Sequence, residues 1–183
     1  MKHRPIQIWT IGHSTRSLEE FLGLLHEQSI AALADVRTMP GSRRYPHFNA
    51  ETLSAALRGK GIEYVHFPEL GGRRKALPDS PNTAWRNASF RGYADHMMTV
   101  AFRDGVDRLL LLAEQKRTAI MCSEAVWWRC HRSLVSDYLK AGGHEVIHIL
   151  GPGKAEPHPF TSAARLVDGQ LSYAADTGFL FRM

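Results

Sequence analysis

The sequence of 183 residues contains little cysteine and no long apolar segment, and both absences narrow the class of protein. Only two cysteines occur, so a disulfide framework is excluded and both thiols are left for chemistry or packing. No apolar run approaches the roughly 20 residues that a membrane-spanning helix needs. The first residues, 1–5, lead into a strand-like segment and not into the apolar stretch of a signal peptide. We therefore expect a cytoplasmic protein without a membrane partner.

Well-known catalytic and binding signatures are also missing. No Gly-x-Gly-x-x-Gly follows the first strand-like segment, and no Gly-x-x-x-x-Gly-Lys occurs. A phosphatase-like loop needs an arginine six residues after its cysteine, but Trp128 stands at that distance from Cys122, and Arg129 comes one residue too late. Neither a Ser/His/Asp order nor a zinc-hydrolase signature is visible. The reaction therefore cannot be derived from a motif.

The composition predicts one globular domain over residues 1–183, with a core at about 6–151 and a C-terminal extension at 152–183. Hydrophobic residues make up 44% of the chain, which suits one sizeable core. Lysine and arginine number 23 against 18 acidic residues, giving a formal net charge of +5 that favours anionic partners. No run of five like charges marks a disordered nucleic-acid-binding tail.

Strand-like and helix-like segments alternate along the chain. Apolar and β-branched residues predict strands at 6–11, 30–36, 62–67, 119–122 and 145–150. Helical spacing predicts a helix capped by Ser17, with Glu20 completing a capping box, and further helices at 49–58, 93–115 and 124–140, with a break near Asp104-Gly105 left open. This order predicts an α/β fold: a single-domain three-layer sandwich with a mainly parallel five-stranded sheet. Residues 170–174 of the C-terminal tail form an extra edge strand or an extended arm.

In a parallel sheet, the residues that follow each strand lie at one edge, where α/β proteins bind their ligands. Polar and ionisable residues follow the predicted strands along the chain. A structural role in turns, caps or ion pairs is the alternative for each of them. The candidates at this edge are His13, Ser14, Asp35, Arg37, Gly71, Gly72, Arg73, Cys122 and Glu124.

The segment 122–132 brings nearly every reactive type of side chain to one strand-to-helix junction. A thiol at a helix N-terminus becomes more acidic, so Cys122 is a candidate nucleophile or redox group, with a buried structural role as the alternative. Glu124 and His13 are candidate proton carriers. Cys130 is expected on the packed side of the helix, so Cys122 should be the more reactive thiol. His131 is either catalytic or a structural ring bonded to a neighbouring loop.

A metal site is a weaker interpretation of the same segment. Cys122, Cys130 and His131 could supply ligands, but they lack Cys-x-x-Cys spacing and would need a fourth group, such as His13 or His148. We therefore assign no metal site, and the cofactor is left unknown.

Six short segments follow one another over about residues 6–151. They are Ile11-Gly12-His13-Ser14, Asp35-Val36-Arg37 with Pro40, Phe48-Asn49, Gly61-Ile62-Glu63-Tyr64, Leu70-Gly71-Gly72-Arg73 and Cys122-x-Glu124 with Cys130-His131-Arg132. Together, and in this order, they resemble the domain of unknown function 488 family. The resemblance implies a compact bacterial and archaeal α/β domain with these positions at its site, and it implies no particular reaction.

Two functions follow from these residues. The first is an enzyme acting on a small anionic, phosphate- or nucleotide-like substrate, with Cys122, Glu124 and His13 as catalytic residues. Guanidinium groups match phosphate geometry, so Arg37, Arg73 and Arg132 are expected to converge with Cys122. Substrate-binding positions are Ser14, Asp35, Arg37, Gly71, Gly72, Arg73, Cys130, His131 and Arg132.

The alternative is a non-catalytic module that binds a nucleotide or nucleic acid, with Trp85, Phe90 or Trp127 available for stacking on bases. A closed crevice would favour the enzyme, and an open basic groove would favour the module. The loop from Leu70 to Phe90, rich in glycine and proline, is predicted to be a lid. The oligomeric state is left unknown.

Overall fold

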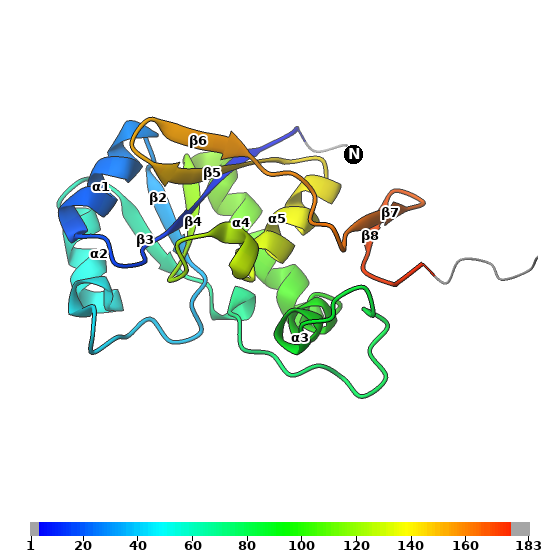
Figure 1. The fold of residues 1–183 in the computed structure, drawn as a ribbon. Coiled ribbons are helices and arrows are strands. Elements are labelled where there is room, and N and C mark those ends of the chain that lie inside the picture. The colour runs from blue at the N-terminus through cyan, green and yellow to red at the C-terminus, as the bar shows by residue number, and fades with distance from the viewer. Residues whose placement is uncertain (1–3, 177–183) are drawn as a thin grey trace, which may run out of the picture.

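The computed structural model describes residues 4–176 and has a six-stranded, mainly parallel sheet at its centre, as Figure 1 shows. The strands lie in the order β3-β2-β4-β1-β5-β6, and β6 pairs antiparallel with β5. The α/β sandwich predicted from the sequence is confirmed, and the C-terminal tail adds a sixth strand at one edge. The strands are β1 (Gln7–Gly12), β2 (Ala32–Asp35), β3 (Glu63–His66), β4 (Thr118–Cys122), β5 (Glu145–Gly151) and β6 (Lys154–Pro157).

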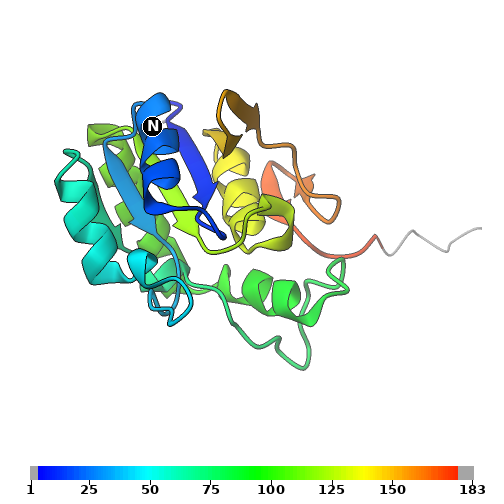
Figure 2. The same ribbon diagram turned by 60° about the vertical axis from the view of Figure 1, so that its left-hand side comes forward.

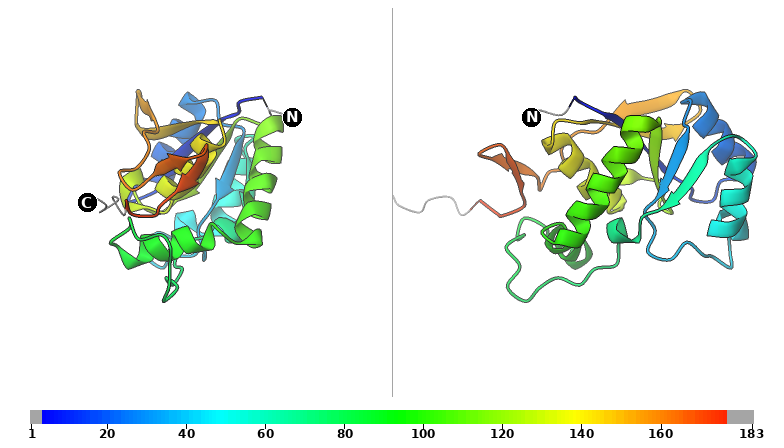
Figure 3. Two further views of the ribbon diagram at one scale, coloured as in Figure 1. Left: turned by 90° about the vertical axis from the view of Figure 1, so that its right-hand side faces the viewer. Right: turned by 180° about the vertical axis from the view of Figure 1, so that it is seen from behind.

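Helices cover both faces of the sheet, because successive strand residues point to opposite sides. Trp9 and Ile11 of β1 pack on one face, with α1 (Leu18–Glu27) and α2 (Ala50–Arg58). Ile8 of the same strand packs on the other face. Figures 2 and 3 show a second layer of helices on that side of the sheet. The helices of this second layer are α3 (Ala88–His96), α4 (Val100–Gln115) and α5 (Arg132–Ala141).

The first helix begins where the sequence predicts, and the third predicted helix divides in a different place. The Ser17 hydroxyl accepts a hydrogen bond from the Glu20 amide, which caps α1. The predicted helix 93–115 is two helices, separated at residues 97–99, and the Thr99 hydroxyl caps α4 by accepting from the Phe102 amide. The predicted break near Asp104-Gly105 is wrong. Gly105 lies inside α4, where a Cβ would stand 3.0 Å from Leu70 Cδ2, so its missing side chain allows close packing.

The predicted helix 124–140 begins later than expected, at Arg132, and a short 3-10 turn, η3 (Trp127–Arg129), precedes it. Tertiary contacts account for the difference. The Glu124 carbonyl accepts a hydrogen bond from the Arg132 guanidinium, at 2.6 Å, and lies where a Cβ at Gly12 would be only 1.8 Å away. This carbonyl is therefore held against β1 by a guanidinium of the later helix, and residues 123–131 cross the end of the sheet as a loop.

The C-terminal extension contributes strand β6 to the sheet and then a separate hairpin of β7 (Arg165–Val167) and β8 (Gln170–Ser172). The expected edge strand from the tail is β6 and not residues 170–174, because β8 pairs with β7 and not with the main sheet. The Tyr173 hydroxyl attaches this hairpin to α5 by donating to Asp137 at 2.8 Å. Residues 177–183, the end of the predicted C-terminal extension, lie outside the described residues.

Among residues 4–176, no helix combines the length and the apolar character needed to cross a membrane.

Candidate active site

Two cysteines and a histidine meet beyond the carboxyl end of the central strands, on the face covered by α3, α4 and α5. Cys122 is the last residue of β4, while Cys130 and His131 directly precede α5. Nδ1 of His131 lies 3.9 Å from the Cys122 sulfur and 3.7 Å from the Cys130 sulfur. Both thiols are buried, at 5% and 3% exposure, and the imidazole is half-buried. The structure therefore brings together three of the predicted site residues.

The hydrogen bonds of His131 define its tautomer. Nε2 lies 3.1 Å from the Val36 carbonyl, which can only accept, so Nε2 carries the hydrogen. In a neutral ring, Nδ1 is then the nitrogen without a hydrogen, and it lies toward both sulfur atoms. A Cβ built at Gly72 would lie 2.9 to 3.4 Å from three ring atoms, and such similar distances place it over the face of the ring. The backbone at Gly72 therefore packs directly on the imidazole.

The two thiols have opposite acidities. Burial opposes the ionisation of Cys130, but the hydrogen bond from the Cys122 thiol and the positive charge of Arg132 lower its pKa to about 6. The same hydrogen bond to Cys130, and then burial, raise the pKa of Cys122 to about 12. These pKa shifts run against the predicted order, in which Cys122 reacts faster than Cys130. Cys122 is not at a helix N-terminus, because α5 begins only at Arg132, whose amide lies 3.5 Å from the Cys130 sulfur.

Arg132 is a buried guanidinium beneath this cluster, with only 1% exposure. It donates to the Thr10 hydroxyl at 3.3 Å and to the Glu124 carbonyl, while its Nε has no hydrogen-bond partner. No carboxylate in the described part of the chain forms an ion pair with it. Its uncompensated positive charge favours a thiolate at Cys130.

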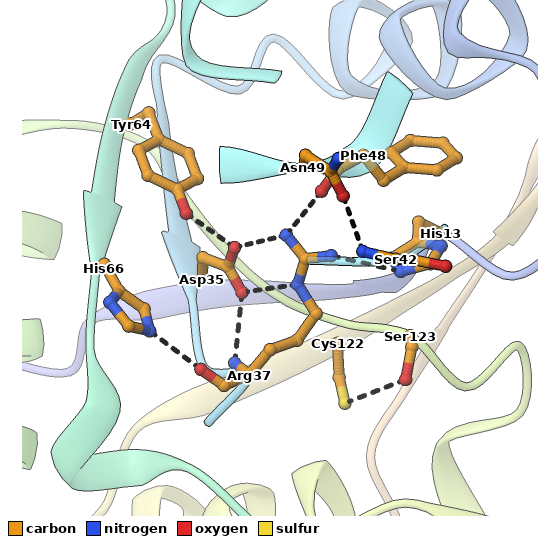
Figure 4. Close-up of polar contacts among 10 residues, drawn as sticks. All are labelled: His13, Asp35, Arg37, Ser42, Phe48, Asn49, Tyr64, His66, Cys122 and Ser123. Carbon is orange, nitrogen blue, oxygen red and sulfur yellow. Dashed lines mark hydrogen bonds and ion pairs between the residues drawn. The ribbon is translucent and has the colours of Figure 1, made fainter. Parts of the chain in front are cut away.

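A second network of polar side chains surrounds the Arg37 guanidinium (Figure 4). Nε and Nη2 of Arg37 bind the two carboxylate oxygens of Asp35, at 2.9 and 2.6 Å, and Nη2 also donates to the Phe48 carbonyl. The Tyr64 hydroxyl donates to the same carboxylate at 2.7 Å. Asp35 is fully buried. Because a guanidinium has five N–H groups and four of these have partners once His13 is included, Arg37 has little capacity left for a substrate.

His13 belongs to this second network. Its ring stacks on Phe48 with 4.3 Å between centroids. Nδ1 donates to the Ser14 carbonyl at 3.0 Å, and Nε2 accepts from Arg37 at 3.4 Å. Burial is the main cause that lowers the pKa of His13 to about 4, so the ring is neutral near pH 7. Both ring nitrogens of His13 are therefore engaged, and the ring orients Arg37. Neither nitrogen is free for the proton-carrying role predicted from the sequence.

The structure separates the three arginines that were expected to converge on Cys122. Arg37 binds partners on the face covered by α1 and α2, and Arg132 is buried on the opposite face. Arg73 alone is exposed, with a φ of 60°, and no described residue accepts a hydrogen bond from it. Arg129, which precedes Cys130, is also exposed and without a partner among the described residues. This corrects the predicted three-arginine site.

The remaining predicted residues frame the cluster. The Glu124 side chain is exposed on the loop after β4, and its backbone carbonyl makes the contacts already described. The Ser14 amide donates to the Ser123 carbonyl at 2.9 Å, which links the ends of β1 and β4. Gly71 ends a 3-10 turn, η2 (Pro68–Leu70), and its carbonyl accepts from Arg74.

The predicted lid is fastened to α3 along much of its length. The Asp95 carboxylate accepts hydrogen bonds from the Leu77 amide, the Ser80 hydroxyl and the Asn82 amide group, at 2.5 to 2.8 Å. Asp95 is buried. These contacts argue against a lid that opens as one piece from residue 70 to 90.

Several residues of the site had no predicted role. Tyr64, which the family resemblance included without a role, and His66 face the Asp35–Arg37 pair from β3, and His66 donates to the Arg37 carbonyl at 2.8 Å. The period of two along neighbouring parallel strands was the signal that could have found them. A buried chain of hydrogen bonds also runs beneath the cluster, and no sequence pattern indicated it. Its members are Thr10, His148, His158 and Asp137.

The fold and the site define an α/β sandwich with a Cys-Cys-His cluster at the carboxyl end of its parallel strands. The sequence model described as Domain of unknown function DUF488 matches residues 17–139, and the chain belongs to this family. The matched range includes Cys122, Cys130 and His131, whereas His13 and Ser14 precede it. Comparison with curated proteins and with solved structures found no match.

Proposed function

We propose that the protein is an enzyme that acts on a small anionic, phosphate- or nucleotide-like substrate at the cluster of Cys122, Cys130 and His131. The observation that carries this proposal is the meeting of all three reactive atoms within 4.8 Å of one another at the carboxyl ends of the strands. Neighbouring ionisable groups whose pKa values are moved in opposite directions are typical of reactive centres.

Burial of the cluster favours an enzyme over a module that binds nucleic acid. A module of that kind presents exposed cationic side chains along a groove. Here Arg37 and Arg132 are at most 7% exposed, and internal acceptors bind their guanidinium groups. Thiols buried at the end of a sheet suit a small molecule better than a nucleic-acid strand. The cytoplasm is the compartment in which both thiols stay reduced.

Arg73 and Arg129 are the cations available to hold the anion. Arg73 directly follows Gly72, whose backbone packs on His131, and Arg129 directly precedes Cys130. Both side chains are exposed, so neither must give up an internal partner to bind a substrate oxygen. Glu124, exposed on the loop after Cys122, is the candidate acid or base from outside the cluster.

The binding part of the proposal is tested by thermal unfolding with inorganic phosphate, nucleoside monophosphates and sugar phosphates. A ligand at 100 times its Kd stabilises the protein by about 2.7 kcal/mol. We expect Arg73→Gln to lose this stabilisation. Arg58→Gln, a change to an exposed arginine at the end of α2, should keep it. Equal stabilisation of all three proteins would contradict the anion site.

The catalytic part is tested on any ligand that binds. The wild type and a Cys130→Ser variant are incubated with that ligand, and products are measured by mass spectrometry. The proposal expects a product with the wild type and a loss of turnover in the variant. A ligand that binds and is never altered would instead support the non-catalytic nucleotide-binding module.

A further inference from the structure

We propose that Cys122, Cys130 and His131 bind a zinc ion through their two sulfur atoms and Nδ1, with a fourth coordination position open to water or substrate. This inference deepens the proposed function and rests on it, because the ion occupies the same cluster and supplies its reactive group. Along the chain, the eight-residue separation of the cysteines argued against a metal site. The fold removes that objection by returning the loop 123–131 to the end of β4.

The three atoms have the chemistry and the spacing of a zinc site. Thiolate and imidazole are the ligands that zinc prefers in tetrahedral sites. Zinc–sulfur and zinc–nitrogen bonds of about 2.3 and 2.0 Å place neighbouring sulfur and nitrogen ligands roughly 3.6 Å apart. The observed distances from Nδ1 to the two sulfur atoms are 3.9 and 3.7 Å. The two sulfur atoms lie within 4.8 Å of each other, against roughly 3.8 Å when both bind one tetrahedral zinc ion. One ion can therefore contact all three atoms once the side chains close around it.

The surroundings of His131 already orient it as a ligand. A metal-bound histidine characteristically donates its other ring N–H to a backbone carbonyl or a carboxylate, which fixes the tautomer. In this structure Nε2 donates to the Val36 carbonyl at 3.1 Å, and this leaves Nδ1 unprotonated beside the sulfurs. Gly72 packs on the ring face and holds the orientation. The buried guanidinium of Arg132 favours the ionised thiolates that an ion requires.

The fourth position has no protein ligand among the described residues, because the two other candidate histidines are engaged elsewhere. Both nitrogens of His13 have partners in the Arg37 network. His148 contacts the Thr10 hydroxyl through Nδ1, at 2.6 Å, and His158 through Nε2, at 2.9 Å. No other histidine, cysteine or carboxylate of the described residues joins the cluster.

Three protein ligands with one open position are typical of catalytic zinc, which activates a bound water or polarises a phosphoryl or carbonyl oxygen. This chemistry supplies what the cluster otherwise lacks. His13 has no free nitrogen, and the Glu124 side chain is exposed outside the cluster. A zinc-bound water gives the proposed enzyme a nucleophile near pH 7, and an exposed Arg73 can hold the substrate anion beside it.

The test is cobalt titration of the full chain, without an affinity tag, after treatment with a chelator and a reductant. Cobalt(II) replaces zinc and reports its ligands by absorption. We expect saturation at about one ion per chain, with sulfur-to-cobalt charge-transfer bands and the d–d bands of tetrahedral cobalt. Zinc should displace the cobalt and remove these bands. A folded, reduced wild type that develops no charge-transfer band overturns the proposal, whatever the variants do.

Variants then identify the ligands. Cys122→Ser and Cys130→Ser should each reduce the charge-transfer intensity. His131→Ala should weaken cobalt binding by about tenfold or more, because even residues that only support a metal ligand cost about tenfold in affinity when they are changed. His26→Ala, a change to an exposed histidine of α1, should leave the titration unchanged. Circular dichroism confirms that each variant is folded. Undiminished bands in either folded serine variant would overturn the proposed ligand set.

Failure of this inference is distinguishable from failure of the proposed function. If phosphate stabilises the chelator-treated protein through Arg73 and cobalt does not bind, the metal site is rejected and the anion site is supported. If cobalt binds and none of the anions binds, the metal site is supported and the proposed substrate class is rejected.

Discussion

The surroundings of Cys130 favour its thiolate, and those of Cys122 favour its thiol. The two residues are chemically identical, and both are almost fully buried. What separates them is their position relative to α5 and to each other. Cys130 lies next to the first residue of the helix and near the Arg132 charge, whereas Cys122 gives its hydrogen bond to Cys130. Single-residue environment therefore decides which thiol is ionised.

Gly72 provides a test at this scale. A Cβ there would lie 2.9 Å from Nδ1 of His131, so Gly72→Ala should push the imidazole away from the two sulfurs. The expected result is weaker cobalt binding, with stability lowered by about 1 to 3 kcal/mol from overpacking. Cobalt titration and denaturant unfolding measure both effects. Gly23→Ala on α1, where a Cβ meets nothing within 4 Å, is the control. Unchanged cobalt affinity in Gly72→Ala would contradict the close packing.

His13 predicts how acid affects stability. Its pKa is about 4 in the folded protein, below the ordinary value of 6.5, so the unfolded chain binds the proton more tightly. The contribution of His13 to the unfolding free energy is fully present above pH 6.5. It falls between pH 6.5 and about 4, at up to about 1.4 kcal/mol per pH unit for one group. Below that window the folded ring is protonated too, and the loss stops. Urea unfolding at a series of pH values should show a smaller slope for His13→Gln. Identical slopes for variant and wild type would contradict a neutral buried ring.

At the scale of elements, local sequence signals predicted most of the regular structure. Ser17 and the β-branched runs placed α1 and the parallel strands close to their observed bounds, because caps and strands depend on neighbouring residues. The loop 123–131 was missed because its conformation depends on contacts distant in sequence. Trp127 stacks on His148 of β5 at 4.4 Å, and Glu124 is bound by Arg132. Helical spacing alone contains no information about such partners.

Asp95 gives a test of the segment between η2 and α3. Its carboxylate accepts three hydrogen bonds from that segment, so Asp95→Asn replaces an acceptor with a donor facing other donors. We expect a loss of about 2 kcal/mol in unfolding free energy. Amide hydrogen exchange over residues 71–87 should also become faster. Asp79→Asn, an exposed change in the same segment, is the control. If both variants match the wild type in stability and exchange, Asp95 does not hold the segment.

At the scale of the whole molecule, the order of elements predicted the edge of the sheet that carries the site. It did not predict that the site residues divide between the two faces of the sheet. Parallel strands brought Asp35, His13 and Cys122 to one edge, as expected. Alternation then sends Asp35 toward α1 and α2, while Val36 and Cys122 share the opposite core. The single predicted site is therefore two adjacent units. One is a saturated network around Arg37, and the other is the cluster of two thiols and an imidazole.

The central claim is that the cluster holds its two thiols in different states, with Cys130 ionising well before Cys122. Thiolate absorbance in the ultraviolet, followed against pH in chelator-treated and reduced protein, tests it without requiring a reagent to reach the buried sulfurs. Subtracting the spectrum of a folded variant with both cysteines replaced by serine removes the absorbance of ionising tyrosines.

The account predicts one thiolate titrating near pH 6, no second thiolate until about pH 12, and loss of the first step in Cys130→Ser. Two thiols titrating together near the ordinary value of 9.0 would contradict it.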